Sequence, residues 1–131
     1  MVIDTSAVLA IFLGESERRA FLDSILGAET RLISAATVLE TGIVLEARRG
    51  EAAGREFDLF LVRAKVEIIP VDGEQADIAR SAWRKYGKGR HPAGLNFGDC
   101  FAYALAKSLN EPLLAKGADF ALTDIELLPM S

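Results

Sequence analysis

The chain has 131 residues, of which 50% are hydrophobic and 26% charged, and its formal net charge is −4 at pH 7. This profile predicts one globular domain over residues 1–131, and the acidic balance excludes a protein that coats nucleic acid by overall charge, though not a nuclease with a local basic patch. The lone Cys100 excludes an internal disulfide, and the lack of a signal-peptide plan or of an apolar run of about 20 residues favours a cytoplasmic protein without a membrane span.

The predicted elements alternate short strands with helices. A buried strand at 2–4 leads into a helix at 5–13, which Asp4 or Thr5 caps and Gly14 ends. A second helix at 15–26 carries acids in its first turn. The remaining expected elements are, in chain order, a strand at 31–34, helices at 36–49 and 52–65, a strand at 66–71, a helix at 74–86, a loop at 87–97, a helix at 98–109, and strands at 112–115 and 125–128.

This order of elements predicts the fold class. Strands separated by helical crossovers indicate an α/β fold, with a central parallel sheet and helices on both faces. The ligand crevice of such a sheet lies beyond the carboxyl ends of its strands. Asp4 stands at that edge, yet the cap of the following helix explains it equally well on local grounds.

Glu40 lies on the predicted helix 36–49 among apolar neighbours. The residues that share its face of the helix are Ala36, Ile43, Val44 and Ala47. We therefore expect Glu40 to face the interior, where an ionised carboxylate needs either a buried basic partner or a metal. Because no Lys or Arg is obviously placed on an inward face, the pattern favours a metal as the partner of the Glu40 carboxylate.

Two further carboxylates follow glycines in the second half of the chain. Asp99 lies in LNFGDC, in the first turn of a helix whose small residues Ala102 and Ala106 allow close approach to neighbouring elements. The helix dipole also explains an acid at this position. Asp119 lies in AKGADFALTD after the apolar run LLA, where the alternative is an ordinary turn aspartate. Asp124 offers the same turn chemistry and ranks below Asp119.

A parallel sheet can bring four acids to one edge, namely Asp4, Glu40, Asp99 and Asp119. Clustered carboxylates raise each other's pKa and destabilise the fold unless a cation offsets their charge. Oxygen ligands suit Mg²⁺ or Mn²⁺ rather than zinc, and such a site activates water for in-line attack on a phosphodiester. The acids therefore predict the chemistry of a metal-dependent nuclease.

A basic segment, RKYGKGRH at 84–91, directly precedes Asp99. It carries the only histidine, His91, and four cations, Arg84, Lys85, Lys88 and Arg90. Such a run is usually a solvated helix end followed by a flexible loop. Beside a metal site it predicts contacts with nucleic-acid phosphates instead, with His91 either a proton donor or a plain loop residue.

Over essentially the whole chain, the segments MVIDTSA, ATVLETGIVL, LNFGDCFAYALA and KGADFALTDI resemble the PIN-domain toxins of bacterial VapBC toxin–antitoxin pairs. The resemblance implies a PIN-like three-layer fold and an endoribonuclease that uses Mg²⁺, with Mn²⁺ as a substitute. It implies that Asp4 and Asp99 bind the metal directly, and that Glu40 and Asp119 complete the catalytic site directly or through water. The supporting polar groups that it implies are Thr5, Ser6, Asn96 and Thr123.

The resemblance also implies partners. Members of the family form homodimers, and a small VapB-like antitoxin inhibits them by laying a helix or extended segment into a groove near the N-terminal helices. The substrate would be RNA, with tRNA as one example, which agrees with the phosphate contacts that the basic segment predicts on its own. One departure from the family pattern is Ala118, where many relatives carry a polar or acidic residue, which predicts a lower metal affinity.

Two other classes of protein match part of the pattern. A catalytically silent PIN-like module would bind RNA or protein without cleavage, but the complete set of acids argues against a degenerate site. A phosphatase with Asp4 as its nucleophile would carry a second aspartate two residues later, where Ser6 stands.

Overall fold

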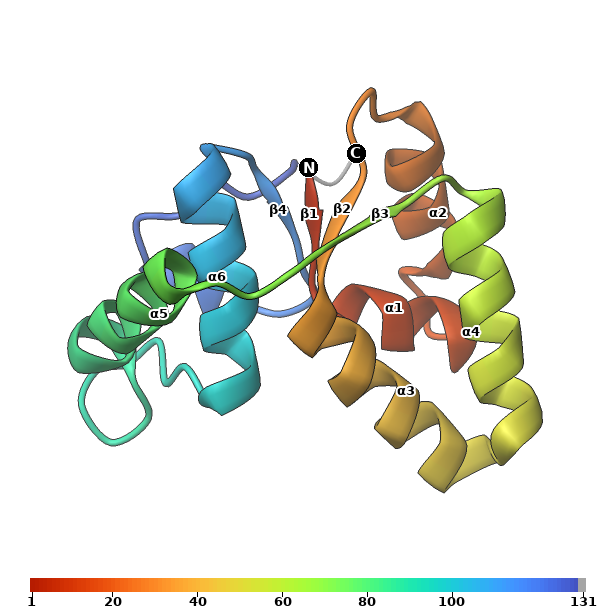
Figure 1. Cartoon of the computed structure of the whole chain (residues 1–131), viewed down its shortest axis with the longest axis horizontal. Coiled ribbons are helices and arrows are strands. Elements are labelled where there is room, and N and C mark those ends of the chain that lie inside the picture. Colours follow the sequence, from red (N-terminus) through yellow and green to blue (C-terminus); the bar gives the residue numbers. More distant parts are fainter. Residues whose placement is uncertain (130–131) are drawn as a thin grey trace.

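A parallel four-stranded sheet in the order β3-β2-β1-β4 forms the centre of the computed structural model, which describes residues 1–129 (Figure 1). The strands are β1 (Val2–Ile3), β2 (Leu32–Ser34), β3 (Glu67–Ile69) and β4 (Leu113–Leu114). The helices are α1 (Thr5–Phe12), α2 (Arg18–Gly27), α3 (Ala35–Arg49), α4 (Glu51–Arg63), α5 (Gly73–Tyr86) and α6 (Phe97–Leu109), with one short 3-10 turn, η1, at Phe120–Leu122. None of the described helices is long and apolar enough to cross a membrane. The last two residues of the domain predicted over 1–131 lie outside the described part.

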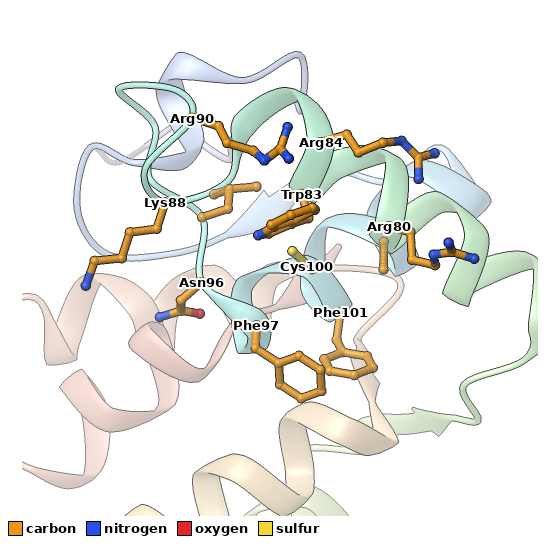
Figure 2. A pocket seen from close by; sticks show the side chains of 11 residues that line it. Arg80, Trp83, Arg84, Lys88, Arg90, Asn96, Phe97, Cys100 and Phe101 are labelled. Carbon is orange, nitrogen blue, oxygen red and sulfur yellow. The ribbon is translucent and has the colours of Figure 1, made fainter.

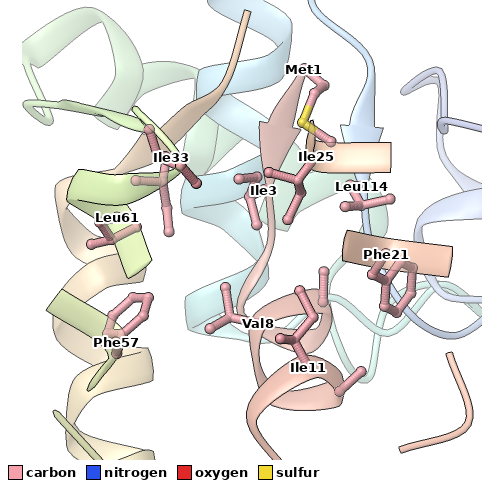
Figure 3. Packing of buried hydrophobic residues seen from close by; sticks show 14 of the residues in the cluster. Met1, Ile3, Val8, Ile11, Phe21, Ile25, Ile33, Phe57, Leu61 and Leu114 are labelled. Carbon is pink, nitrogen blue, oxygen red and sulfur yellow. The ribbon is translucent and has the colours of Figure 1, made fainter. Parts of the chain in front are cut away.

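Each face of the sheet carries its own apolar core, because successive residues of a strand point to opposite faces. The strand residues that point toward α1, α2, α3 and α4 are Ile3, Ile33 and Leu114 (Figure 3). The strand residues that point toward α5, α6 and the C-terminal segment are Val2, Leu32 and Leu113. Helices therefore cover both faces, and the predicted α/β fold with a central parallel sheet is confirmed.

The carboxyl ends of the strands meet at one edge, and this edge positions the candidate site. In the centre of the sheet Val2 pairs with Leu32 on one side and with Leu113 on the other. Directly after β1, the Asp4 N–H donates to the Leu114 carbonyl at 3.0 Å. Asp4 therefore lies beside the carboxyl end of β4. On the other side of β1 lies β2, and α3 starts immediately after β2.

The second helix starts at Arg18 and not at residue 15, so its expected first-turn acids lie before the helix. Gly14 has a left-handed φ of +69°, which breaks the chain direction after α1. Glu15 and Glu17 then turn toward Lys116, whose Nζ lies 2.7 Å and 3.5 Å from their carboxylates. The two acids tie this turn to the segment after β4 instead of stabilising the start of the helix.

The expected strand at 125–128 is wrong. One isolated parallel bridge forms there, between Leu113 and Leu127. Its hydrogen bonds run from the Leu113 N–H to the Glu126 carbonyl and from the Leu128 N–H to the Leu113 carbonyl, both at 2.9 Å. Because the contact is limited to this one residue pair, residues 125–128 form an isolated bridge and not a strand.

Candidate active site

Asp4 follows β1 directly and caps α1 with its side chain. Its Oδ2 atom accepts hydrogen bonds from the Ser6 N–H at 3.0 Å and from the Ser6 hydroxyl at 2.6 Å. The Ser6 hydroxyl accepts in turn from the Lys116 N–H at 2.8 Å, which ties the cap to the segment after β4. The cap interpretation is confirmed, and it engages only one of the two carboxylate oxygens.

Asp4 is also a strongly perturbed acid, with only 4% of its surface exposed. Burial raises the pKa of its carboxyl to about 6, although the two hydrogen bonds from Ser6 lower it. The charges of Asp99 and Glu40 raise this pKa further, so both carboxylates lie within electrostatic range. Ionised Asp4 is therefore costly at neutral pH, and a nearby cation would relieve that cost.

Glu40 reaches the site from the flank of α3, and the expected inward apolar face is wrong. The buried side chains of α3 belong to Thr37, Thr41 and Leu45, whereas Ile43 is 60% exposed. Glu40 is half-buried at the border between these two faces. Both the expected apolar stripe and the stripe of Thr37, Thr41 and Leu45 follow the helical period, so the period alone did not decide which one faces inward. The second stripe is the buried one, and its Thr41 contacts Thr5 of α1.

A hydroxyl bridge holds the Glu40 carboxylate next to α1. The Thr5 hydroxyl donates to Glu40 Oε1 at 2.6 Å and accepts from the Thr41 hydroxyl at 3.2 Å. Support of Asp4 by a hydrogen bond is expected from either Thr5 or Ser6, and the structure shows that Ser6 provides it while Thr5 bonds to Glu40. Each of these two acids therefore has its own hydroxyl donor from the first turn of α1.

Asp99 stands in the first turn of α6 and forms a capping box with Asn96. The Asn96 side chain accepts from the Asp99 N–H at 2.9 Å, and Asp99 Oδ2 accepts from the Asn96 N–H at 3.0 Å. Burial raises the pKa of Asp99, and the charges of Asp119 and Glu40 raise it further. Asn96, expected as a supporting polar group, thus fixes the orientation of this acid.

Gly98 allows the first turn of α6 to lie against Glu40. A Cβ atom at this glycine would overlap the Glu40 carboxylate. The missing side chain of Gly98 therefore lets α6 and α3 approach closely within the site. Gly98 could not be identified from the sequence, because the requirement for a missing side chain comes from a residue on another helix.

Asp119 lies at the exposed start of η1, and its charge contributes to the raised pKa of Asp99. Asp124, ranked below Asp119, accepts a hydrogen bond from the Tyr103 hydroxyl at 2.6 Å and forms an ion pair with Lys107 at 2.7 Å. Its role is therefore structural, because both partners belong to α6. Thr123, expected to support the acids, bonds only within its own turn, to the backbone of Phe120 and Ile125.

The acids have no basic partner within residues 1–129. None of the ion pairs in this range includes any of the four acids, which are Asp4, Glu40, Asp99 and Asp119. As they stand, no three His, Cys, Asp or Glu side chains in the same range converge closely enough to hold a metal ion. The donor set nevertheless fits Mg²⁺ or Mn²⁺ in its chemistry, because it offers only carboxylate oxygens that already repel one another.

The predicted basic segment borders a groove of about 730 Å³ between α5 and the start of α6 (Figure 2). Of its four cations, Arg84, Lys88 and Arg90 line the groove and Lys85 does not. Arg80 lines it as well, and its position one helical turn before Arg84 was a sequence feature that could have identified it. His91 has a loop role, since its Nδ1 accepts from the Ala93 N–H at 3.0 Å.

Sequence comparisons find relatives that match almost the whole chain. The model of the PIN domain family matches residues 1–126. The chain is 54% identical over 125 residues to the ribonuclease VapC of Mycolicibacterium smegmatis, a match that covers 95% of this chain and 97% of the relative. It is also 54% identical over 125 residues to ribonuclease VapC30 of Mycobacterium tuberculosis, which covers 95% of each chain.

Solved structures share the fold at low sequence identity. The crystal structure of VapC20 from Mycobacterium tuberculosis, described as a Sarcin-Ricin loop cleaving toxin, superposes with a TM-score of 0.78 at 17% identity and covers 97% of each chain. The structure of VapBC2 from Rickettsia felis, bound to a DNA fragment from its promoter, gives a TM-score of 0.74 at 17% identity, with 97% of this chain and 96% of that chain covered.

Proposed function

The chain belongs to the PIN domain family and, within it, to the VapC ribonucleases, and from this membership we propose that it is the endoribonuclease toxin of a type II toxin–antitoxin pair. The observation that carries the proposal is the group of four acids, which have no basic partner among the described residues. Burial and the charges of neighbouring acids raise the pKa of Asp4 and of Asp99. Asp124, by contrast, is paired with Lys107.

We propose Mg²⁺ as the cofactor, with Mn²⁺ as a substitute. Asp4 and Asp99 would bind it directly, and Glu40 and Asp119 would complete the site directly or through water. When bound, such a cation supplies a Lewis acid beside the scissile phosphodiester and offsets the negative charge of the acids. The raised pKa values of Asp4 and Asp99 support this, because both carboxylates are desolvated by burial and also feel the charge of neighbouring acids, so that a bound cation would stabilise their ionised forms.

The groups around the acids would orient them. Ser6 holds Oδ2 of Asp4, Thr5 holds Oε1 of Glu40, and the Asn96 N–H holds Oδ2 of Asp99. In each case the bonds are made to a single oxygen, which leaves the second oxygen of the carboxylate for a metal or for water. Carboxylates fixed in this way lose little side-chain freedom when a cation binds, which favours a defined site.

The test is RNA cleavage by the purified protein in Mg²⁺, in EDTA, and with the variant Asp99→Asn. We expect cleavage in Mg²⁺ that is lost in EDTA and in the variant, because asparagine keeps an oxygen for the capping box but not the charge for a metal. The matched control is Asp23→Asn, which removes an exposed aspartate of α2 and should cleave like the wild type. Undiminished cleavage in EDTA or by Asp99→Asn would overturn the mechanism.

We further propose a VapB-like antitoxin as the inhibitory partner and a homodimer as the toxin's own assembly. A groove of about 280 Å³ between the N-terminal helices α1 and α2 and helix α4 supports the first proposal, since it has the location expected for an antitoxin segment. Its lining includes Phe12, Leu22 and Phe60 together with Arg18 and Arg63, which suits an amphipathic helix. Titration of the toxin with the product of an adjacent short reading frame, followed by loss of RNA cleavage, tests this proposal.

A further inference from the structure

The groove between α5 and α6 combines exposed aromatic rings with unpaired positive charge. Trp83 of α5 is 44% exposed, and Phe97 at the start of α6 is 81% exposed. The Phe97 ring packs edge-on against Phe101, with the ring centroids 4.9 Å apart. All three aromatic residues line the same groove, and Figure 2 shows Phe97 and Phe101 next to each other, with Trp83 near Cys100. Large aromatic side chains left in water mark a surface that binds something with an apolar or aromatic face.

The positive charge surrounds these rings. Four cations line the groove, and they are Arg80, Arg84, Lys88 and Arg90. Within residues 1–129 none of them forms an ion pair, and none of the described residues that line the groove is acidic. The Arg90 guanidinium lies 4.2 Å from the centre of the Trp83 ring, which holds this charge over the groove. In a chain with a net charge of −4, this is a local concentration of positive charge.

The groove and the acids lie on adjacent sides of the first turn of α6. Asn96 lines the groove and also forms the capping box with Asp99. Phe97 faces the groove, whereas the next residue, Gly98, faces Glu40. A flexible chain held in the groove would therefore pass the acids within the span of one helical turn.

We propose that this groove binds an unstacked, single-stranded segment of the RNA substrate, with one base stacked on Phe97, another against the Trp83–Arg90 pair, and phosphates on the surrounding cations. The inference rests on the proposed ribonuclease function. Single-stranded RNA matches both features together, because bases stack on aromatic rings and phosphates pair with arginine and lysine. A paired stem would match only the charges, since its bases are already stacked on each other.

Trp83 provides a direct probe, because it is the only tryptophan of the chain. We would titrate the full chain in EDTA, which blocks metal-dependent cleavage, with a short fluorescein-labelled single-stranded RNA of mixed sequence. Trp83 fluorescence should be quenched with the same midpoint as the rise in fluorescein anisotropy. RNA binding that leaves the Trp83 fluorescence unchanged would overturn the proposal.

Variants at Phe97 separate stacking from simple apolar contact. Phe97→Tyr keeps an aromatic ring and should bind the RNA within about twofold of the wild type. Phe97→Leu keeps an apolar side chain without a ring and should bind about 5- to 100-fold more weakly. Both changes fall on an exposed side chain, so the fold should tolerate them. Equal affinity of the two variants would contradict the stacking proposal.

The cations are tested by the salt dependence of binding. Each phosphate contact on a single strand contributes a slope of about −0.7 to the plot of log affinity against log salt concentration. The double variant Arg80→Gln/Arg84→Gln should therefore flatten this slope by about 1.4. The matched control Arg48→Gln/Arg49→Gln removes the same charge from the exposed end of α3 and should leave the slope unchanged.

The outcomes distinguish this inference from the proposed function. If the wild type cleaves RNA in Mg²⁺ but all groove variants bind like the wild type, the groove inference is wrong and the ribonuclease function stands. If the wild type neither binds nor cleaves any RNA, both fail. If Phe97→Ser lowers the sedimentation coefficient while RNA affinity is unchanged, the groove is a contact between copies of the chain and the RNA proposal is wrong.

Discussion

The Thr5 hydroxyl donates a 2.6 Å hydrogen bond to Glu40 Oε1, and this bond joins the first turn of α1 to the middle of α3. The two residues are 35 positions apart in the chain. The bond fixes a carboxylate that is only half-buried and would otherwise be free to turn into solvent. Together with the bonds from Ser6 to Asp4 and from Asn96 to Asp99, it means that three of the four acids are each held by hydrogen bonds to one carboxylate oxygen.

Thr5→Val should lower RNA cleavage about tenfold and raise the Mg²⁺ concentration needed for half-maximal activity. The valine has the same shape but cannot donate to Glu40, and a hydrogen bond to a charged group contributes about 1.5–3 kcal/mol. The measurement is the cleavage rate as a function of Mg²⁺ concentration. Thr5→Ser restores a hydroxyl and should recover most of the activity. A Thr5→Val enzyme with an unchanged Mg²⁺ dependence would show that this bond does not position Glu40 for function.

Asp4→Asn should abolish cleavage and yet make the metal-free protein more stable above pH 6. The pKa of Asp4 is raised from 3.8 to about 6 in the folded protein, so the native state binds this proton more tightly than the unfolded chain. The free energy of unfolding of the wild type therefore falls, relative to that of the variant, as the pH rises from about 4 to about 6. The full difference is on the order of 3 kcal/mol and is reached above pH 6.

Denaturant unfolding of both proteins in EDTA, from pH 4 to pH 7.5, measures this difference. Asparagine retains an oxygen that accepts from the Ser6 N–H, so the cap of α1 is kept. A variant that is less stable than the wild type at pH 7.5 would mean that the bonds from Ser6 outweigh the cost of the buried charge, and that Asp4 is mainly a helix cap.

Gly98→Ala should reduce activity without unfolding the protein. The new Cβ would overlap the flexible end of Glu40, which can swing away, while alanine favours the helix by up to about 1 kcal/mol. The measurements are the melting temperature and the cleavage rate of the same preparation. Gly42→Ala is the matched control, because a Cβ atom at this glycine of α3 would meet no neighbouring atom within 4 Å. Full activity of Gly98→Ala would show that the position of Glu40 is not critical.

The sequence predicted those features of the site that depend on local patterns. Asp4 as a cap follows from an acid between a buried strand and a helix, and the helix starts near Thr5 and Asp99 follow from similar local cues. The capping box of Asn96 and Asp99 also has a readable spacing, although the helix dipole alone accounts for an acid at Asp99. The helical period placed Glu40 on an inward apolar face, which is wrong, and the role of Glu40 in the site stays a prediction.

The remaining features depend on contacts between elements far apart in the chain. The overlap of Gly98 with Glu40 and the bond from Thr5 to Glu40 arise only when α1, α3 and α6 pack together. The stripe of α3 that turns inward is likewise decided by its packing partners, because both candidate stripes have the same period. The exposed rings of Trp83 and Phe97 could not be foreseen, since large aromatic residues are usually expected in a core.

Calorimetric titration with Mg²⁺ and Mn²⁺ tests most directly whether the four acids form one divalent-cation site. We predict saturable binding to the wild-type protein that is lost in Asp99→Asn, while Asp23→Asn binds like the wild type. Absence of specific binding to the wild type, or unchanged binding to Asp99→Asn, would contradict such a site and favour a catalytically silent module.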